Sequence, residues 1–214
     1  MAAAREARVP VAVHLDHGPD VETVRRCVAA GYTSLMIDGS ELPLEANIAL
    51  TRAAVLAAPG LAVEGELGGV GGDEERSGDQ TTAIPMTRPA EARRFVAETG
   101  VASLAVAIGN AHGVYKGTPR LDFARLEAVR RAVPVPLVLH GASGIPDDAL
   151  RRAIALGVRK INVNTETRQA LFESLAASLR AGVPGYDVTR LFGQAMQAMQ
   201  QAIEAKLRLF REPA

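Results

Sequence analysis

Six short apolar runs, each rich in Val, Ile or Leu and each followed by a helical pattern, most constrain the fold of this chain. The runs occupy residues 9–16, 34–39, 61–68, 103–109, 135–141 and 159–165. Near-continuous apolar runs are typical of strands that are buried on both faces of a parallel sheet. Strands that alternate with helices indicate βαβ units. The sequence therefore predicts an α/β fold with six β/α units.

Polar clusters at the ends of these runs decide between a doubly wound sheet and a barrel. The clusters are Asp16 with His17, Asp38, Glu66, Asn110 with His112, His140, and Asn162 with Asn164. Polar groups gathered at the carboxyl ends of consecutive strands are typical of the active face of a (β/α)8 barrel. We therefore expect a TIM-type barrel, incomplete with about six β/α units plus C-terminal helices, in a single domain over residues 1–214.

A complete barrel has eight strands and about 250 residues. Two more units of about 30 residues each do not fit into the eight residues before the first run. We therefore expect either a shortened start or an open architecture. An incomplete barrel would expose two strand edges, so we also expect this chain alone to be poorly soluble or weakly active.

The C-terminal stretch 187–210 has the periodicity of one amphipathic helix. Its apolar stripe consists of Val188, Leu191, Phe192, Met196, Met199, Ile203 and Leu207. We expect this stripe to pack either on the barrel or on another subunit.

Charge and cysteine content exclude several classes of function. Lys plus Arg equals Asp plus Glu at 24 each, so nothing favours a nucleic-acid or membrane-surface partner. No apolar run approaches the roughly 20 residues that span a membrane, and the first residues lack the apolar core of a signal peptide. We expect a cytoplasmic protein. Cys27 is the single cysteine, which excludes an internal disulfide and a cysteine-based zinc site.

Three of the four histidines lie at or just after strand ends, namely His17, His112 and His140. Strand ends of one barrel converge, and three histidines with an open position form a catalytic zinc site. They lie too far apart in the sequence to make a local motif, so three separate structural histidines are the alternative. Asp38 and Glu66 end apolar strands, where a carboxylate must bind a metal or pair with arginines.

Two small-residue segments follow the last two predicted strands, GASG at 141–144 and NVNT at 162–165. Barrels often bind phosphate in these two loops, where small residues let backbone N–H groups reach an anion. A zinc hydrolase could use the same three histidines, but it would leave the paired loops unexplained. The polar loop 69–82 is either a solvated surface segment or a mobile flap next to the site.

Six segments, agreeing in order and spacing from about residue 9 to 210, resemble the signature segments of class II (zinc-dependent) ketose-bisphosphate aldolases. They are most similar to the fructose-bisphosphate and tagatose-bisphosphate branch, which belongs to glycolysis and related carbohydrate metabolism. The segments are HLDHG (14–18), MIDGS (36–40), EGELGGVGGDEE (64–75), AIGNAHGVYKGTP (107–119), LVLHGASGIP (137–146) and KINVNTE (160–166).

The resemblance implies a role for each matching residue. Asp16 matches the catalytic acid/base, and Glu74 matches the residue that moves a proton at the carbon next to the ketone. His17, His112 and His140 match the Zn²⁺ ligands, whereas Asp38 and Glu66 match carboxylates that hold the metal in an alternative position. The matches to the dihydroxyacetone phosphate site are Gly113, Gly141, Ala142, Ser143, Asn162, Val163, Asn164 and Thr165.

The resemblance also implies a reaction and partners. The reaction is reversible cleavage of fructose or tagatose 1,6-bisphosphate to dihydroxyacetone phosphate and glyceraldehyde 3-phosphate. The phosphate region would hold a monovalent cation, Na⁺ or K⁺, and the chain would form a homo-oligomer, a dimer or a tetramer. The competing aldolase chemistry uses a lysine Schiff base; we expect none of Lys116, Lys160 and Lys206 to be placed for it. A non-catalytic or unstable fragment, or an interaction subunit, is the alternative.

Overall fold

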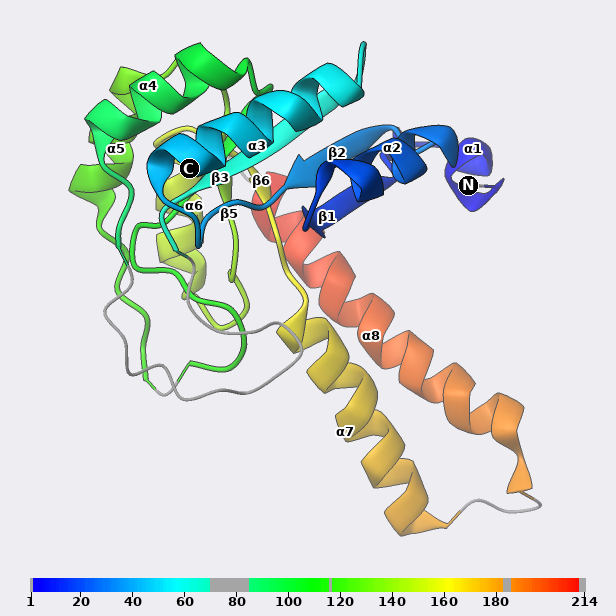
Figure 1. Ribbon diagram of the computed structural model, residues 1–214. Coiled ribbons are helices and arrows are strands. Elements are labelled where there is room, and N and C mark those ends of the chain that lie inside the picture. Colours follow the sequence, from blue (N-terminus) through cyan, green and yellow to red (C-terminus); the bar gives the residue numbers. More distant parts are fainter. Residues whose placement is uncertain (1, 70–84, 116, 183–185, 212–214) are drawn as a thin grey trace.

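The computed structural model describes residues 2–69, 85–115, 117–182 and 186–211. Six parallel strands form one curled sheet whose order follows the sequence (Figure 1). The strands are β1 His14–Gly18, β2 Ser34–Ile37, β3 Ala62–Leu67, β4 Ser103–Val106, β5 Leu137–Leu139 and β6 Val158–Ile161. A doubly wound sheet reverses its strand order at a switch point, and this sheet does not. The predicted incomplete TIM-type barrel is therefore confirmed.

The helices that lie between strands cover the outer face of the sheet (Figure 1), and further helices precede the first strand and follow the last. They are α1 Ala2–Glu6, α2 Val21–Ala29, α3 Leu44–Ala57, α4 Pro89–Thr99, α5 Phe123–Ala132, α6 Asp147–Ala155, α7 Thr165–Ala181 and α8 Val188–Arg211. Side-chain caps begin two of them: Asp20 accepts from the backbone N–H of Thr23, and Asp122 accepts from that of Arg125. None of these helices is long and apolar enough to cross a membrane, within the part of the chain that is described.

The main hydrophobic core lies between the sheet and α4, α5 and α6. Its fully buried members include Phe95, Leu104, Leu126, Leu137 and Leu150. This core supports the strands from outside, so the strand ends can carry polar groups without loss of packing.

The first strand begins later than the predicted 9–16. Pairing with β2 starts at His14, and the Val13 carbonyl just before it accepts from Thr33 and Ser34. Val9 and Val11 are 66% and 48% exposed. Apolar composition alone therefore placed the strand too early, because a strand needs a paired neighbour as well as apolar side chains.

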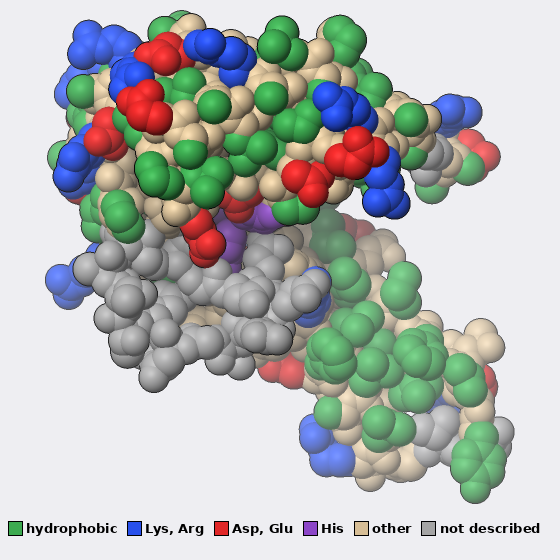
Figure 2. All heavy atoms as spheres, viewed as in Figure 1, with side chains coloured by type: hydrophobic (Ala, Val, Ile, Leu, Met, Phe, Trp, Pro, Cys, Tyr) green, Lys and Arg blue, Asp and Glu red, His purple; other side chains and the backbone are tan. Residues whose placement is uncertain are grey.

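Helices α7 and α8 pack against each other and project away from the sheet as a hairpin (Figure 1). The predicted C-terminal helix is confirmed, but most of its stripe does not pack on the barrel. Large apolar side chains on both helices are exposed, and Figure 2 shows them gathered over the hairpin. We define the hairpin face as Phe172, Leu179, Val188, Phe192, Met196, Ile203 and Leu207.

Candidate metal centre and active site

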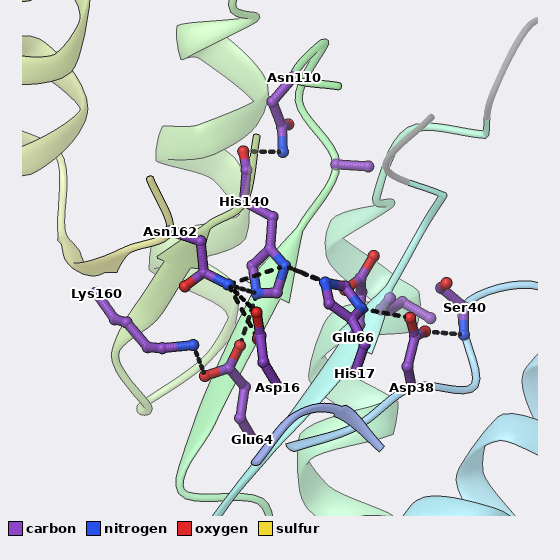
Figure 3. Close-up of polar contacts among 12 residues, drawn as sticks. Asp16, His17, Asp38, Ser40, Glu64, Glu66, Asn110, His140, Lys160 and Asn162 are labelled. Carbon is purple, nitrogen blue, oxygen red and sulfur yellow. Dashed lines mark hydrogen bonds and ion pairs between the residues drawn. The ribbon is translucent and has the colours of Figure 1, made fainter. Parts of the chain in front are cut away.

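The carboxyl ends of the strands bring three predicted histidines together, two of which, His17 and His140, are labelled in Figure 3. His17 ends β1, His112 lies in the segment after β4, and His140 directly follows β5. One ring nitrogen from each lies within 4.8 Å of the others. His140 is fully buried and His112 is 7% exposed. Three residues that are up to 123 positions apart in the chain thus converge, as the barrel interpretation predicted.

The backbone at His17 has an unusual conformation. Its φ is 45°, in the left-handed region, and the pairing of β1 with β2 is irregular between Leu15 and Gly18. Such backbone costs on the order of 1–3 kcal/mol in a residue other than glycine and is often found at functional sites. The ring of His17 faces Asp38, whose Oδ2 lies 2.6 Å from Nδ1.

Asp38 and His17 form a charged pair. The carboxylate of Asp38 also accepts from the backbone N–H of Ser40 at 3.0 Å. Burial opposes charge on both groups, but it is outweighed. Hydrogen bonds from His17 and Ser40 hold the pKa of Asp38 well below its usual range. The bond to Asp38, with the charges of Glu66 and Asp16, raises the pKa of His17 to about 9.

Glu66 is a buried carboxyl group in an environment that disfavours its negative charge. Its side chain is 1% exposed, and Oε2 has no hydrogen-bond partner among the described residues. That oxygen lies 3.9 Å from Nδ1 of His17 and 3.8 Å from Nδ1 of His140. Burial, followed by the negative charge of Asp38, raises the pKa of Glu66 to about 8. A buried carboxylate oxygen without a hydrogen bond is costly, and a cation bound beside it would remove that cost.

The donor groups fit a divalent metal ion. Nε2 of His17 and Nδ1 of His140 face each other at 3.0 Å. Two nitrogen ligands of a tetrahedral zinc, each about 2.0–2.1 Å from the metal, lie about 3.3 Å apart. A second set of donors, His17 with Asp38 and Glu66, also lies within 4.8 Å. The two sets share His17, so one ion could be held in either of two neighbouring positions.

Asp16 lies near His140, because Nδ2 of Asn162 contacts both side chains. It is exposed, and its two carboxylate oxygens accept from Nδ2 of Asn162 at 3.0 and 3.2 Å. This contact joins β1, the first strand, to the segment after β6, the last (Figure 3). A carboxylate that is accessible and adjacent to the histidines is suited to exchange a proton with a bound molecule.

A tyrosine ties the segment that carries His112 to the segment after β5. The Tyr115 hydroxyl accepts from the backbone N–H of Ala111 and donates to the carbonyl of Gly141, both at 2.8 Å. Gly141 has a φ of 61°, and a Cβ there would lie 2.1 Å from the Ala111 carbonyl oxygen. Only glycine permits this close approach.

The two small-residue segments also meet. The Asn162 carbonyl accepts from the N–H of Ala142 at 3.2 Å, and Ser143 Oγ accepts from the N–H of Glu166 at 3.2 Å. Thr165 begins α7, so the segment 162–165 leads into a helix N-terminus, which favours anions. The remaining predicted positions here are Val163, Asn164 and, with a φ of 83°, Gly113.

Sequence reasoning assigned no role in the site to Glu64 or Lys160. Glu64 is buried on β3, and its Oε1 lies 2.8 Å from Nε2 of His140. The sequence assigns Lys160 no role in the site, yet its Nζ donates to Oε2 of Glu64 at 2.8 Å. Strand β6 has only four residues, and a lysine side chain is long enough to extend from β6 to Glu64 on β3. The i, i+2 spacing of Glu64 and Glu66 places both on one face of a strand, which could have identified Glu64.

Glu74, and the flap predicted at 69–82 except for its first residue, lie outside the described residues.

Comparison with known proteins identifies the family. The family model described as fructose-bisphosphate aldolase class-II matches residues 1–213. The chain belongs to the class II fructose-bisphosphate aldolase family. It is therefore an aldolase, a lyase that acts on a carbon–carbon bond.

Solved structures of other aldolases are similar to this one. The YdjI aldolase from Escherichia coli K12 is 39% identical with a TM-score of 0.84, and the match covers 98% of this chain and 73% of that one. Fructose-bisphosphate aldolase (Fba) from Campylobacter jejuni is 25% identical with a TM-score of 0.76, over 94% of this aldolase and 71% of that chain.

Proposed function

We propose that this aldolase is a zinc-dependent ketose-bisphosphate aldolase that cleaves fructose 1,6-bisphosphate or tagatose 1,6-bisphosphate. The products would be dihydroxyacetone phosphate and glyceraldehyde 3-phosphate. The observation that carries the proposal is the convergence of His17, His112 and His140 near Asp16 in a member of this family. Asp38 and Glu66 would hold the ion in its second position, close to His17.

The reaction breaks the bond between C3 and C4 of the sugar. Asp16 takes the proton of the C4 hydroxyl, so that C4 becomes the aldehyde carbon while the bonding electron pair stays with C3. A bound divalent ion supplies Lewis-acid stabilisation of the negative charge that develops next to C3. Glu74 then donates a proton to C3. Each carboxylate is thus assigned to one proton.

Orientation of the substrate falls to the small-residue segments. The phosphate of the dihydroxyacetone half would be held by Gly113, Gly141, Ala142, Ser143, Asn162, Val163, Asn164 and Thr165, with Na⁺ or K⁺ nearby. Support comes from the junction of the two segments at the N-terminus of α7. A phosphate fixed there would keep C3 and C4 aligned with the catalytic groups.

Lys160 calls for a test of the Schiff-base alternative, because it lies close to the histidines. Its ammonium group is paired with Glu64, whereas imine formation needs a neutral amine. We expect borohydride to trap no adduct when either sugar bisphosphate is present.

Metal dependence tests the proposal directly. Purified protein should cleave at least one of the two sugar bisphosphates. Exhaustive treatment with EDTA should abolish cleavage, and zinc or cobalt should restore it, with about one ion bound per chain. Cleavage that survives chelation would contradict the proposal. A chain that binds zinc but cleaves neither sugar would instead be a non-catalytic relative or an interaction subunit.

We also propose that the chain acts as one domain over residues 1–214, forms a homo-oligomer and works in the cytoplasm. The hairpin face supports the oligomer. Contiguous exposed apolar patches above a few hundred Å² mark interaction sites, and this face bears large side chains that are 40% to 64% exposed. A stable interface buries roughly 800 Å² on each partner, which apolar side chains along two helices can provide. The equal numbers of basic and acidic residues give no reason for a nucleic-acid or membrane partner.

A further inference from the structure

Glu64 connects two groups that the proposed function does not use together. Its Oε1 lies 2.8 Å from Nε2 of His140, and its Oε2 lies 2.8 Å from Nζ of Lys160. The three side chains come from β3, the end of β5, and β6 (Figure 3). Glu64 and His140 are 2% and 0% exposed. Both oxygens of a buried carboxylate are therefore occupied, one by a histidine and one by a cation.

The contact determines which nitrogen of His140 carries the hydrogen. An ionised carboxylate can only accept hydrogen bonds, so Nε2 of His140 must donate to it. In the neutral ring that metal binding requires, Nδ1 is then the unprotonated nitrogen, with a lone pair available to a metal. That same Nδ1 faces Nε2 of His17 and lies 3.8 Å from Glu66. Glu64 thus favours the tautomer in which Nδ1 of His140, the nitrogen that faces the other donors, can bind a metal.

Lys160 keeps Glu64 in this arrangement. The ammonium group has only donors, so it holds one carboxylate oxygen and leaves the other for His140. Nζ also lies 3.3 Å from Nε2 of His14, whose Nδ1 contacts Oγ of Ser34 at 2.8 Å. The cation is therefore anchored from a second side.

We propose that Glu64 and Lys160 are positioning residues for the metal centre: Glu64 orients His140 and sets its tautomer, and Lys160 orients Glu64. This inference rests on the metal centre of the proposed function. Partners that hold the second nitrogen of a ligand histidine commonly change metal affinity by about 10- to 100-fold when they are removed. Neither residue needs to touch the metal or the substrate.

The decisive variant is Glu64→Gln. With Lys160 present, the introduced amide should turn its oxygen toward the ammonium group and its NH₂ toward His140. His140 would then accept at Nε2 and carry its hydrogen on Nδ1. We expect zinc affinity, measured by competition with a chromophoric chelator, to fall about 10- to 100-fold. Long-range ¹H–¹⁵N spectra of the chelated protein should show one ring change tautomer, which is readable because the chain has four histidines.

The double variant Glu64→Gln/Lys160→Met separates positioning from general damage. Without the ammonium group, the amide oxygen is free to accept from His140, so the double variant should bind zinc more tightly than Glu64→Gln alone. Two independent structural losses would give the opposite order. Lys160→Arg should retain near-normal affinity.

The surface pair Glu45 and Arg94, whose carboxylate and guanidinium groups make two hydrogen bonds, provides a matched control. Glu45→Gln and Arg94→Met should leave zinc affinity and the histidine spectrum unchanged. If the unmodified protein binds no zinc, the proposed function fails. If it binds zinc and Glu64→Gln binds equally tightly with the same tautomer, this inference is overturned while the proposed function stands.

Discussion

At the scale of residues, metal binding and proton transfer are assigned to different side chains at the strand ends. Substitution of Asp16 separates these two roles. Asp16→Ala should retain the metal, because neither of the two donor sets among the described residues includes Asp16. Cleavage should fall by about 10²- to 10⁴-fold, as is usual when a general acid or base is removed. Zinc content and steady-state rates on both sugar bisphosphates measure the two effects.

His112→Ala is the comparison variant and should lose both zinc and cleavage. If Asp16→Ala loses its zinc and an excess of zinc restores full turnover, then Asp16 is a ligand and its assignment as a base is wrong.

Protonation of His17 and Glu66 gives the chelated protein an unusual dependence on pH. Both folded pKa values are raised, to about 9 from 6.5 and to about 8 from 4.5. Protonation therefore favours the folded state. Protonated Glu66 makes its full contribution to the free energy of unfolding below pH 4.5, and this contribution is lost as pH rises through 8. Protonated His17 makes its full contribution below pH 6.5, and this contribution is lost as pH rises through 9.

We expect the thermal midpoint of EDTA-treated protein to fall between pH 5 and pH 9. Added zinc should stabilise the protein more as pH rises, because the ion replaces the protons that these groups hold. Scanning calorimetry in matched buffers, with EDTA or with zinc, measures both trends. A chelated protein whose midpoint rises steadily over this range would show that the site does not hold these protons.

Most residues of the candidate site could be selected from their place in the sequence. Asp16, His17, Asp38, Glu66 and His140 each follow or end an apolar run, and the barrel brings such ends together. Residues that act through a neighbouring side chain are harder to predict from the sequence. Glu64 and Lys160 point to the site from within strands, and their importance depends on which nitrogen of a histidine they contact. No pattern of residue types encodes that choice.

At the scale of elements, the contact between the segments after β4 and β5 depends on Gly141. Gly141→Ala would add the strain of a positive φ, on the order of 1–3 kcal/mol, and a clash with the Ala111 carbonyl. We expect a loss of about 3 kcal/mol or more in the free energy of unfolding, with weaker zinc binding, because His112 follows Ala111.

Gly60→Ala is the matched control. Gly60 has a φ of 80°, and nothing lies within 4 Å of a Cβ added there. Gly60→Ala should lower the free energy of unfolding only by the strain of the positive φ, and it should leave zinc binding unchanged. Urea unfolding and zinc competition of both variants would measure the difference, and equal losses in both would mean that the close approach contributes nothing.

Element types were predictable, and their boundaries and partners less so. Strand and helix alternation identified all six β/α units. The first strand was placed too early, because the valines at 9 and 11 are apolar but lie before the first residue that pairs. The periodicity of α8 predicts an apolar stripe. An amphipathic pattern indicates that one face of a helix is buried, but it does not indicate the surface against which that face packs.

The whole molecule extends its hairpin away from the sheet, and the hairpin face leads to a prediction about assembly. Replacing Phe172 and Phe192 with lysine should break an interface formed there, because a charge is costly in an apolar contact. We expect the unmodified chain to sediment as a dimer or tetramer and this double variant as a smaller species.

Leu56→Lys is the control. Leu56 is 76% exposed on α3, away from the hairpin, and its replacement should leave the sedimentation coefficient unchanged. Unmodified protein that is monomeric at micromolar concentration would contradict the proposed interface.

The contact between Asp16 and Asn162 spans 146 positions of the chain. Neighbouring strands can pair through much shorter loops, and closing a longer loop costs more chain entropy. This contact therefore forms only after the intervening strands are in register. Contacts of such separation slow folding. During refolding, the helices should regain their signal first and the catalytic face last, so the capacity to capture a metal marks the completion of the fold.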